Sequence, residues 1–137
     1  MMFGLKFMRT SPRSMLRSCA SWLCVAVGAV ERLDDVRFVS PRQFRLVNTV
    51  SFVVHGADST ALLAGLDLEG ICASSGSACS AGSLEPSHVI RALGLEDELA
   101  NSLVRFSLGR ESTLEEVQFV ESVLPRVVAR ARNSGPV

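Results

Sequence analysis

Short apolar segments with a period of two occur in the second half of the chain and predict β-strands. Residues 48–54 and 103–109 alternate between apolar and polar positions, and residues 71–74 form a shorter apolar segment. In the last strand, Leu103, Arg105 and Ser107 fall on the face opposite the apolar one. The residues expected on the apolar faces are Val50, Phe52, Val54, Val104, Phe106 and Leu108.

Helical signals lie between and after these strands. Asp58 can cap a helix over residues 59–68, and Pro86 suits the first turn of a second helix over residues 86–95. Thr113 and Glu116 have the spacing of a capping box, which predicts the start of a last helix. Its apolar stripe is expected at Val117, Val120, Leu124, Val127 and Ala131. Together these patterns predict an α+β fold, in which helices cover an antiparallel or mixed three-stranded sheet.

Composition favours one globular domain with a modest core. The chain has 137 residues, of which 47% are apolar and 20% charged. Its 14 basic residues balance its 14 acidic residues, so it has no chain-wide basic footprint for nucleic acid. No uninterrupted apolar run reaches the roughly 18 residues that a membrane-spanning helix needs. We therefore expect neither nucleic acid nor membrane as a partner.

The first part of the chain differs from the rest. Residues 1–30 contain Lys6 and three arginines but no acidic residue, and an apolar run follows the basic stretch. This is typical of a signal peptide, of a mitochondrial presequence, or of an ordinary helix or leader before the domain. The last interpretation is preferred. We expect a leader over residues 1–43 and a domain over residues 44–137.

The four cysteines show no CxxC pair and no zinc-ligand spacing with histidine. Cys72 lies between two apolar residues of a predicted strand, where burial is expected. Cys79 instead lies in a stretch of Gly, Ser and Ala residues, which predicts a long loop with an accessible thiol. An accessible thiol can act as a nucleophile once it is ionised, although composition alone does not establish that role. Cys19 and Cys24 are expected to be apolar leader residues.

Two segments together carry a resemblance to a known family. The sequences LDLEGICASSGSACSAGSLEPSHVIRALGL and LVRFSLGR strongly resemble the C-terminal part of cysteine desulfurases of the NifS/IscS type. These are class V aminotransferases, which belong to the fold-type I pyridoxal-phosphate enzymes. The resemblance runs from about Arg45 to about Arg132. It implies the small C-terminal domain of such an enzyme, with the long catalytic loop.

The resemblance also implies roles for two residues. The cysteine of SSGSAC, here Cys79, would take sulfur from L-cysteine as a persulfide, leave L-alanine, and pass the sulfur to an acceptor such as an iron–sulfur scaffold protein. The arginine of RFSLGR, here Arg105, would bind the substrate carboxylate, which suits guanidinium chemistry. Members of the family are expected to be dimers. The following Arg110 is given no role beyond the surface or a domain interface.

The chain departs from the family pattern at the cofactor. Lys6 is its only lysine, and its context GLKF does not match the lysine that holds pyridoxal phosphate. The histidine and carboxylate that contact the cofactor ring are also unmatched. We therefore expect a large domain on another chain to supply the cofactor. The alternative is a chain without enzymatic activity, either a truncated remnant or a sulfur-relay or binding module that uses Cys79 alone.

The remaining candidates are weaker. His88 can be a proton donor near the loop or, by preference, a histidine on a helix surface. His55 is expected to be structural or exposed, and Glu96, Asp97 and Glu98 to form the solvated acidic start of a helix, which suits the helix dipole. The expected location is the cytoplasm, with the mitochondrion as the alternative because the start of the chain has no acid.

Overall fold

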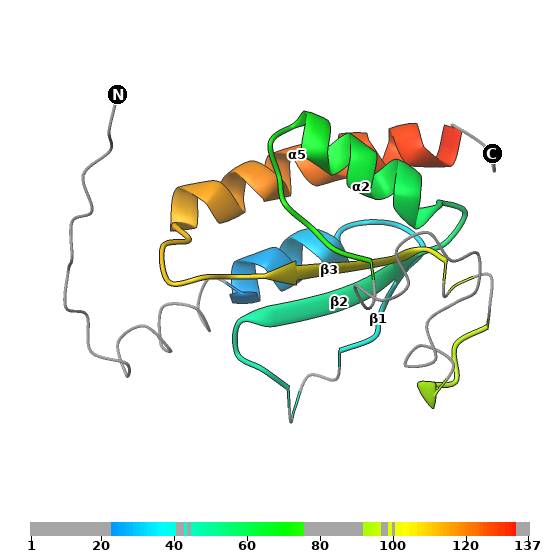
Figure 1. Cartoon of the computed structure of the whole chain (residues 1–137), viewed down its shortest axis with the longest axis horizontal. Coiled ribbons are helices and arrows are strands. Elements are labelled where there is room, and N and C mark those ends of the chain that lie inside the picture. Colours follow the sequence, from blue (N-terminus) through cyan, green and yellow to red (C-terminus); the bar gives the residue numbers. More distant parts are fainter. Residues whose placement is uncertain are drawn as a thin grey trace.

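The computed structural model describes residues 23–40, 43, 45–75, 92–96, 99 and 101–133 (Figure 1). Within them, residues 23–31 are helical. The other elements in chain order are β1 (Val36–Phe38), β2 (Thr49–Val54), α2 (Ser59–Leu68), β3 (Leu103–Ser107) and α5 (Leu114–Asn133). Of the predicted helix over residues 86–95, residues 86–91 lie outside the described residues, and of the described residues 92–95 only residue 92 is helical.

The sheet has three antiparallel strands in the order β1-β2-β3, so β2 is central. Phe52 in β2 lies opposite Phe38 in β1 and Val104 in β3. This confirms the predicted α+β fold with a three-stranded sheet, and the strands predicted over residues 48–54 and 103–109. The apolar residues of β2 and β3 lie on the same face of the sheet, because side chains alternate between the two faces and the register pairs apolar residues with each other.

One predicted strand is wrong. Residues 71–74 form no strand, and only Ser74 makes an isolated bridge, to Arg105 of β3. The third strand of the sheet is instead Val36–Phe38, within the segment predicted as a leader. The Ile71 amide is not available for strand pairing, because it donates to the carbonyl of Leu66 at 2.9 Å at the end of the preceding helix.

Helix α2 begins and ends as its sequence predicts. The Asp58 carboxylate accepts hydrogen bonds from the amides of Thr60 and Ala61, at 2.8 and 3.3 Å. Gly70 follows the helix with φ +76°, a conformation that favours glycine. Its amide donates to the carbonyl of Asp67, which together with the Ile71 bond forms a Schellman motif. The motif directs the chain from the helix back to the sheet.

Helix α5 starts with the predicted capping box. The Thr113 amide donates to the Glu116 carboxylate at 2.9 Å, and the Glu116 amide donates to the Thr113 hydroxyl at 3.2 Å. The helix continues through Pro125, which removes one backbone hydrogen bond. Burial of side chains on both sides of the proline offsets this loss. The buried residues of the helix are Val117, Val123, Leu124, Val127, Val128 and Ala131.

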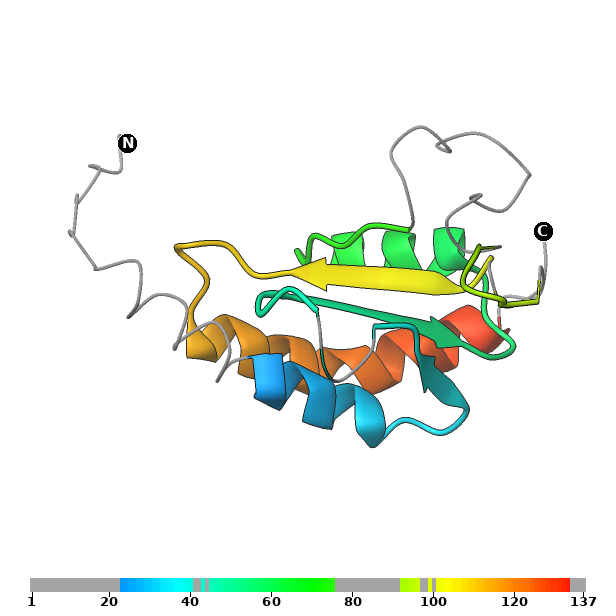
Figure 2. The same cartoon turned by 90° about the horizontal axis from the view of Figure 1, so that it is seen from below.

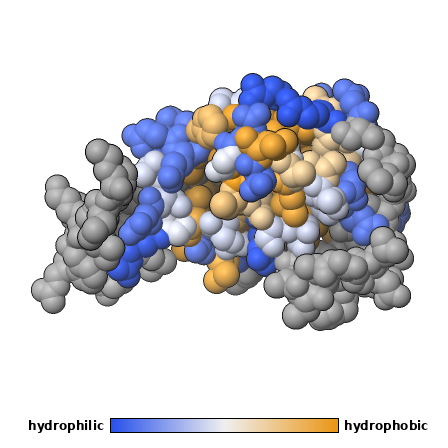
Figure 3. All heavy atoms as spheres, turned by 45° about the horizontal axis from the view of Figure 1, so that its top comes forward, coloured by the Kyte–Doolittle hydropathy of each residue, from blue (hydrophilic) through white to orange (hydrophobic). Residues whose placement is uncertain are grey.

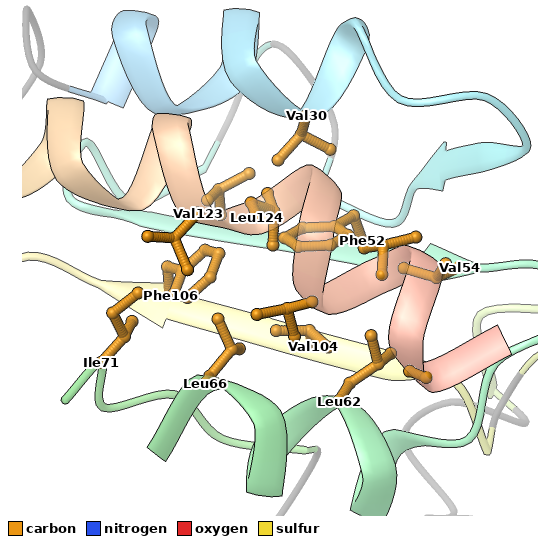
Figure 4. Close-up of a cluster of buried hydrophobic side chains, with 14 of the residues drawn as sticks. Val30, Phe52, Val54, Leu62, Leu66, Ile71, Val104, Phe106, Val123 and Leu124 are labelled. Atoms are coloured by element: carbon orange, nitrogen blue, oxygen red, sulfur yellow. The ribbon is translucent and has the colours of Figure 1, made fainter. Parts of the chain in front are cut away.

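The core lies between one face of the sheet and a single layer of helices. Figures 2 and 4 show α5 in the middle of that layer, with α2 on one side and the helical residues 23–31 on the other. Phe52 and Phe106 from adjacent strands meet at its centre, with ring centroids 5.7 Å apart. Both rings pack among aliphatic side chains from all three helices (Figure 4). This burial is the main stabilising contribution to the domain.

Described residues before the expected boundary at residue 43 contribute to the same core. Leu23 and Val30 are buried in it, and Val36 and Phe38 pack against it. The Arg32 side chain also forms an ion pair with Glu121 of α5. The boundary between residues 43 and 44 stays a prediction, but the described part of the expected leader is packed against α5 and β2.

The two faces of the molecule differ in chemistry. On the helical side, apolar side chains gather near the middle of the surface and hydrophilic ones surround them (Figure 3). The opposite face of the sheet has a small second cluster, in which Val53 and Leu103 pack with Leu95. Beyond this cluster the same sheet face carries polar residues. We call that part, defined by Thr49, Ser51, Arg105 and Ser107, the open sheet face.

Candidate functional site

Arg105 lies in the middle of β3, on the open sheet face. Its neighbours Val104 and Phe106 are buried in the core, whereas Arg105 is exposed, as the alternation predicts. Directly across the sheet it faces Ser51 of β2. Within the described part of the chain, its guanidinium has no hydrogen-bond or ion-pair partner. The group is thus available to an external carboxylate.

Hydroxyl groups surround Arg105 on this face. Ser51 lies opposite it, and Thr49 pairs with Ser107 one step along the strands. The Thr49 and Ser107 hydroxyl oxygens are 3.4 Å apart. An exposed guanidinium among small hydroxyl side chains leaves room for a bidentate carboxylate. The open sheet face therefore has the donors that recognition of a small carboxylate requires.

A second segment joins β3 at Arg105. The Arg105 amide donates to the Ser74 carbonyl at 2.7 Å, and the Ser74 amide donates to the Arg105 carbonyl at 3.1 Å. We call these two hydrogen bonds the Ser74 bridge. The sequence does not single out Ser74, and the available signal is that it begins the Ser- and Gly-rich stretch. The structure thus adds a neighbour of Arg105 that the pattern alone does not identify.

Cys79 lies outside the described residues. The last described residue before it is Ser75, next to the Ser74 bridge. Only four residue steps separate Ser75 from Cys79, so covalent geometry limits their Cα atoms to within about 14 Å of each other. The segment that carries Cys79 therefore starts beside the strand that carries Arg105.

Cys72 is exposed, so its predicted burial is wrong. The reason is that Ile71 and Ala73 on either side of it pack against the core, so Cys72 points to the other side. Cys72 lines an open hollow of about 540 Å³, together with Ser107 and Phe119. A thiol that the sequence predicts to be structural is thus accessible at the edge of β3.

The other candidate residues have diverse locations. Cys24 is exposed on the helical residues 23–31. His55 is exposed, and its carbonyl accepts a hydrogen bond from Arg132 at 3.1 Å. Glu96 and Arg110 are also exposed. Those that lie outside the described residues are Lys6, Cys19, His88, Asp97 and Glu98. None of the described candidates joins Arg105 in one cluster.

The described residues contain no cluster of metal ligands and no membrane-spanning helix. Among them, no group of three or more His, Cys, Asp or Glu side chains lies close enough to hold a metal ion. None of the helices in the described part of the chain is both long and apolar enough to cross a membrane.

The residues present do not fit pyridoxal phosphate. This cofactor needs a lysine for its Schiff base, and the described ranges contain none. The only lysine of the whole sequence, Lys6, lies outside them. The open sheet face carries one guanidinium and several hydroxyls, a set that suits a carboxylate group.

The fold has clear counterparts among solved structures. A NifS-like protein from Rickettsia africae superposes with a TM-score of 0.72 and 25% sequence identity, over 83% of this chain and 29% of that one. A second NifS-like protein superposes with a TM-score of 0.70. The α+β fold described above is thus similar to a part of NifS-like pyridoxal-phosphate enzymes.

The sequence comparisons agree with the fold. The family model "Aminotransferase class-V" matches residues 8–120, and the chain belongs to this family. The cysteine desulfurase IscS of Dictyoglomus turgidum is 41% identical over 106 residues, which is 77% of this chain and 27% of the relative. A cysteine desulfurase of Nostoc sp. is 46% identical over 92 residues, or 67% of this chain and 23% of the relative. The chain thus spans about a quarter of the length of these relatives.

Proposed function

We propose that this chain supplies the carboxylate-binding and sulfur-accepting part of a cysteine desulfurase, and works with a separate domain that holds pyridoxal phosphate. The observation that carries this proposal is the placement of Arg105. Its guanidinium has no partner among the described residues and lies on the open sheet face, and the Ser74 bridge brings the start of the Cys79 segment to the same residue. One small substrate could therefore meet both groups.

Arg105 binds the carboxylate of L-cysteine in this proposal. A guanidinium holds a carboxylate with two parallel charge-assisted hydrogen bonds, which fix its orientation as well as its position. The neighbouring hydroxyls of Ser51 and Ser107 provide further donors on the same face. Arg105 thereby orients the substrate so that its sulfur points away from the sheet.

Cys79 accepts the sulfur. Its thiolate attacks the sulfur of L-cysteine, and a new S–S bond forms as the C–S bond of the substrate breaks. The electron pair of the broken bond stays on the substrate carbon, which takes up a proton and becomes the methyl group of L-alanine. The persulfide on Cys79 then passes to an acceptor thiol or an iron–sulfur scaffold protein.

Stabilising the electron pair on carbon is the task of the family cofactor, which the residues of this chain do not fit. The proposal assigns only two tasks to this chain: binding the substrate carboxylate and accepting the substrate sulfur. It places the protein in the cytoplasm, where thiols are kept reduced, with the mitochondrion as the alternative.

The test is a reconstitution assay. The purified chain is mixed with the N-terminal remainder of a class V desulfurase, such as the Dictyoglomus turgidum relative, loaded with pyridoxal phosphate. We expect sulfide and L-alanine to form in equal amounts from L-cysteine and a reducing thiol. Cys79→Ser should abolish turnover. Arg105→Gln should raise KM for L-cysteine about 10- to 100-fold, the range for losing a hydrogen bond to a charged group.

Matched variants make the result specific. Arg110→Gln removes an exposed arginine just after the same strand and should leave KM unchanged. Cys24→Ser removes an exposed thiol elsewhere and should leave turnover unchanged. A mixture of folded chains that never turns over L-cysteine would overturn the proposal. If Cys79 alone still accepted a persulfide from another desulfurase, detected by mass spectrometry, the sulfur-relay alternative would replace it.

A further inference from the structure

We infer that Ser74 is a positioning residue, whose backbone fixes the segment carrying Cys72 and the start of the Cys79 segment to the strand that carries Arg105. The functional meaning of this inference rests on the proposed function. Its structural content concerns only described residues. It starts from the pairing of the two residues in both directions, with bonds of 2.7 and 3.1 Å.

The Ser74 bridge occurs at one residue of an edge strand. In an antiparallel sheet, successive residues direct their amide and carbonyl groups to opposite neighbours. The backbone groups of Arg105 point away from β2 and are paired with Ser74. Without Ser74 they would bond only to water, and the segment after residue 71 would lose its backbone bonds to β3 and keep only the packing of Ala73 against the core.

The segment is also held at its other end. The Ile71 amide donates to the carbonyl of Leu66 at 2.9 Å, and the Ile71 side chain is buried in the core. Residues 71 and 74 are therefore two fixed points, three residues apart. Between them the chain has little freedom, so the direction in which it leaves Ser75 is set by the Ser74 bridge.

The same geometry places Cys72 on the face of Arg105. Bridged residues put their side chains on one face, and in an extended segment a residue two positions away points to that face as well. Cys72 is exposed, whereas Ile71 is buried in the core and Ala73 packs against it, so Cys72 points away from the core as this arrangement requires. Cys72 is thus the diagonal neighbour of Arg105, two residues along from its direct partner Ser74. Residues in such diagonal pairs are about 7–8 Å apart.

Amide hydrogen exchange of the chain alone tests the Ser74 bridge without any substitution. We expect the Arg105 amide to exchange slowly, with a protection factor within about tenfold of those of Val104 and Phe106, which pair with β2. An Arg105 amide that exchanges at the rate of an unfolded peptide would overturn the inference.

Alkylation of Cys72 gives a second test, using iodoacetate and iodoacetamide with mass spectrometry to locate each product. The Cys72 ratio is the rate of alkylation by anionic iodoacetate divided by the rate with neutral iodoacetamide, and a nearby positive charge raises it. The same ratio at exposed Cys24 is the internal reference. Arg105→Gln should lower the Cys72 ratio about twofold, the effect of one unit charge about 8 Å away in water. Glu115 and Glu116 line the same hollow and are present in every variant, so their effect cancels.

Ser74→Pro removes the amide that donates to Arg105 and should lower the Cys72 ratio as far as Arg105→Gln does. Ser74→Ala keeps the backbone bonds and should behave as the wild type. A Ser74→Pro chain that folds, with an unchanged Cys24 ratio and melting temperature, and keeps the wild-type Cys72 ratio would overturn the inference. If it fails to fold, the exchange rate of the Arg105 amide decides instead.

In the reconstituted mixture, Ser74→Pro should lower kcat about tenfold or more and change KM less than twofold, because misplacing a reacting group acts on the chemical step. Arg105→Gln should instead raise KM. Equal effects of Ser74→Pro on both parameters would contradict a positioning role. Exchange and alkylation need no turnover, so they test the Ser74 bridge even where the proposed function fails.

Discussion

Gly65 marks the closest approach of α2 and α5, and its replacement by alanine should destabilise the domain. A Cβ atom at position 65 would lie 2.8 Å from Cγ1 of Val127, which is too close, so the Val127 side chain or one of the helices must shift. Val127 is only 1% exposed, so its side chain has no free space to enter. Such overpacking costs about 1–3 kcal/mol.

Helix propensity opposes this cost. Alanine is about 0.8–1.0 kcal/mol more favourable than glycine inside a helix. The net expectation for Gly65→Ala is therefore a loss of about 1 kcal/mol in the free energy of unfolding. Gly28 provides the matched control, because a Cβ there would meet only Arg32 at an ordinary 3.8 Å. Gly28→Ala should gain up to about 1 kcal/mol.

Urea denaturation followed by circular dichroism measures both changes, and a double-mutant cycle identifies the contact responsible. Val127→Ala alone should cost about 2–3 kcal/mol through lost burial and a cavity. Combined with Gly65→Ala, it should cost at least about 0.5 kcal/mol less than the sum of the single changes, since the new methyl group fills part of the space. If Gly65→Ala stabilised the domain as much as Gly28→Ala does, the close packing of α2 and α5 would be refuted.

Three further substitutions have defined outcomes in the same denaturation assay. Ser102→Ala should cost about 0.5–1.5 kcal/mol, because the buried Ser102 hydroxyl donates to the Leu99 carbonyl and accepts from the Val54 amide, which keeps its second bond to the Ser102 carbonyl; a change within error would mean that these two side-chain bonds contribute nothing to stability. Thr113→Ala should cost about 1 kcal/mol by breaking the capping box with Glu116, and Thr113→Ser should restore most of it. Arg105→Gln should change stability by less than about 0.5 kcal/mol, because an exposed side chain with no partner among the described residues contributes little; a larger loss would point to a structural role for the arginine.

Local signals predicted the elements that local interactions determine. The caps of α2 and α5 were predictable from Asp58, Thr113 and Glu116, because a cap depends on residues within one turn. The alternation in β2 and β3 was equally informative, since burial on one face fixes it. The apolar stripe of the last helix was found in part: the pattern missed Val123 and Val128, which widen its buried face.

Pairing between distant segments was less predictable. Residues 36–38 and 71–74 are both short and partly apolar, and sequence alone favours the second as a strand. Tertiary contacts decide which of the two segments becomes the third strand. Strand β1 pairs with Val53 and Val54 of β2, whereas the Ile71 amide is bonded to the end of α2. The exposure of Cys72 follows from the same long-range choice, so a local pattern could not reveal it.

The open sheet face sets a physical limit on what Arg105 can do by itself. An ion pair between an exposed guanidinium and a carboxylate contributes only about 0.2–1 kcal/mol in water, because both groups are well hydrated and salt screens them. Recognition of a small amino acid needs more, and a covered surface provides it, since the same pair is stronger where water is excluded. Among the described residues, Arg105, Ser51 and Ser107 carry their donors on the face of the sheet opposite the packed core. A second domain seated over this face would strengthen carboxylate binding at Arg105 without changing any residue of the chain, which is the division of labour that the proposed function requires.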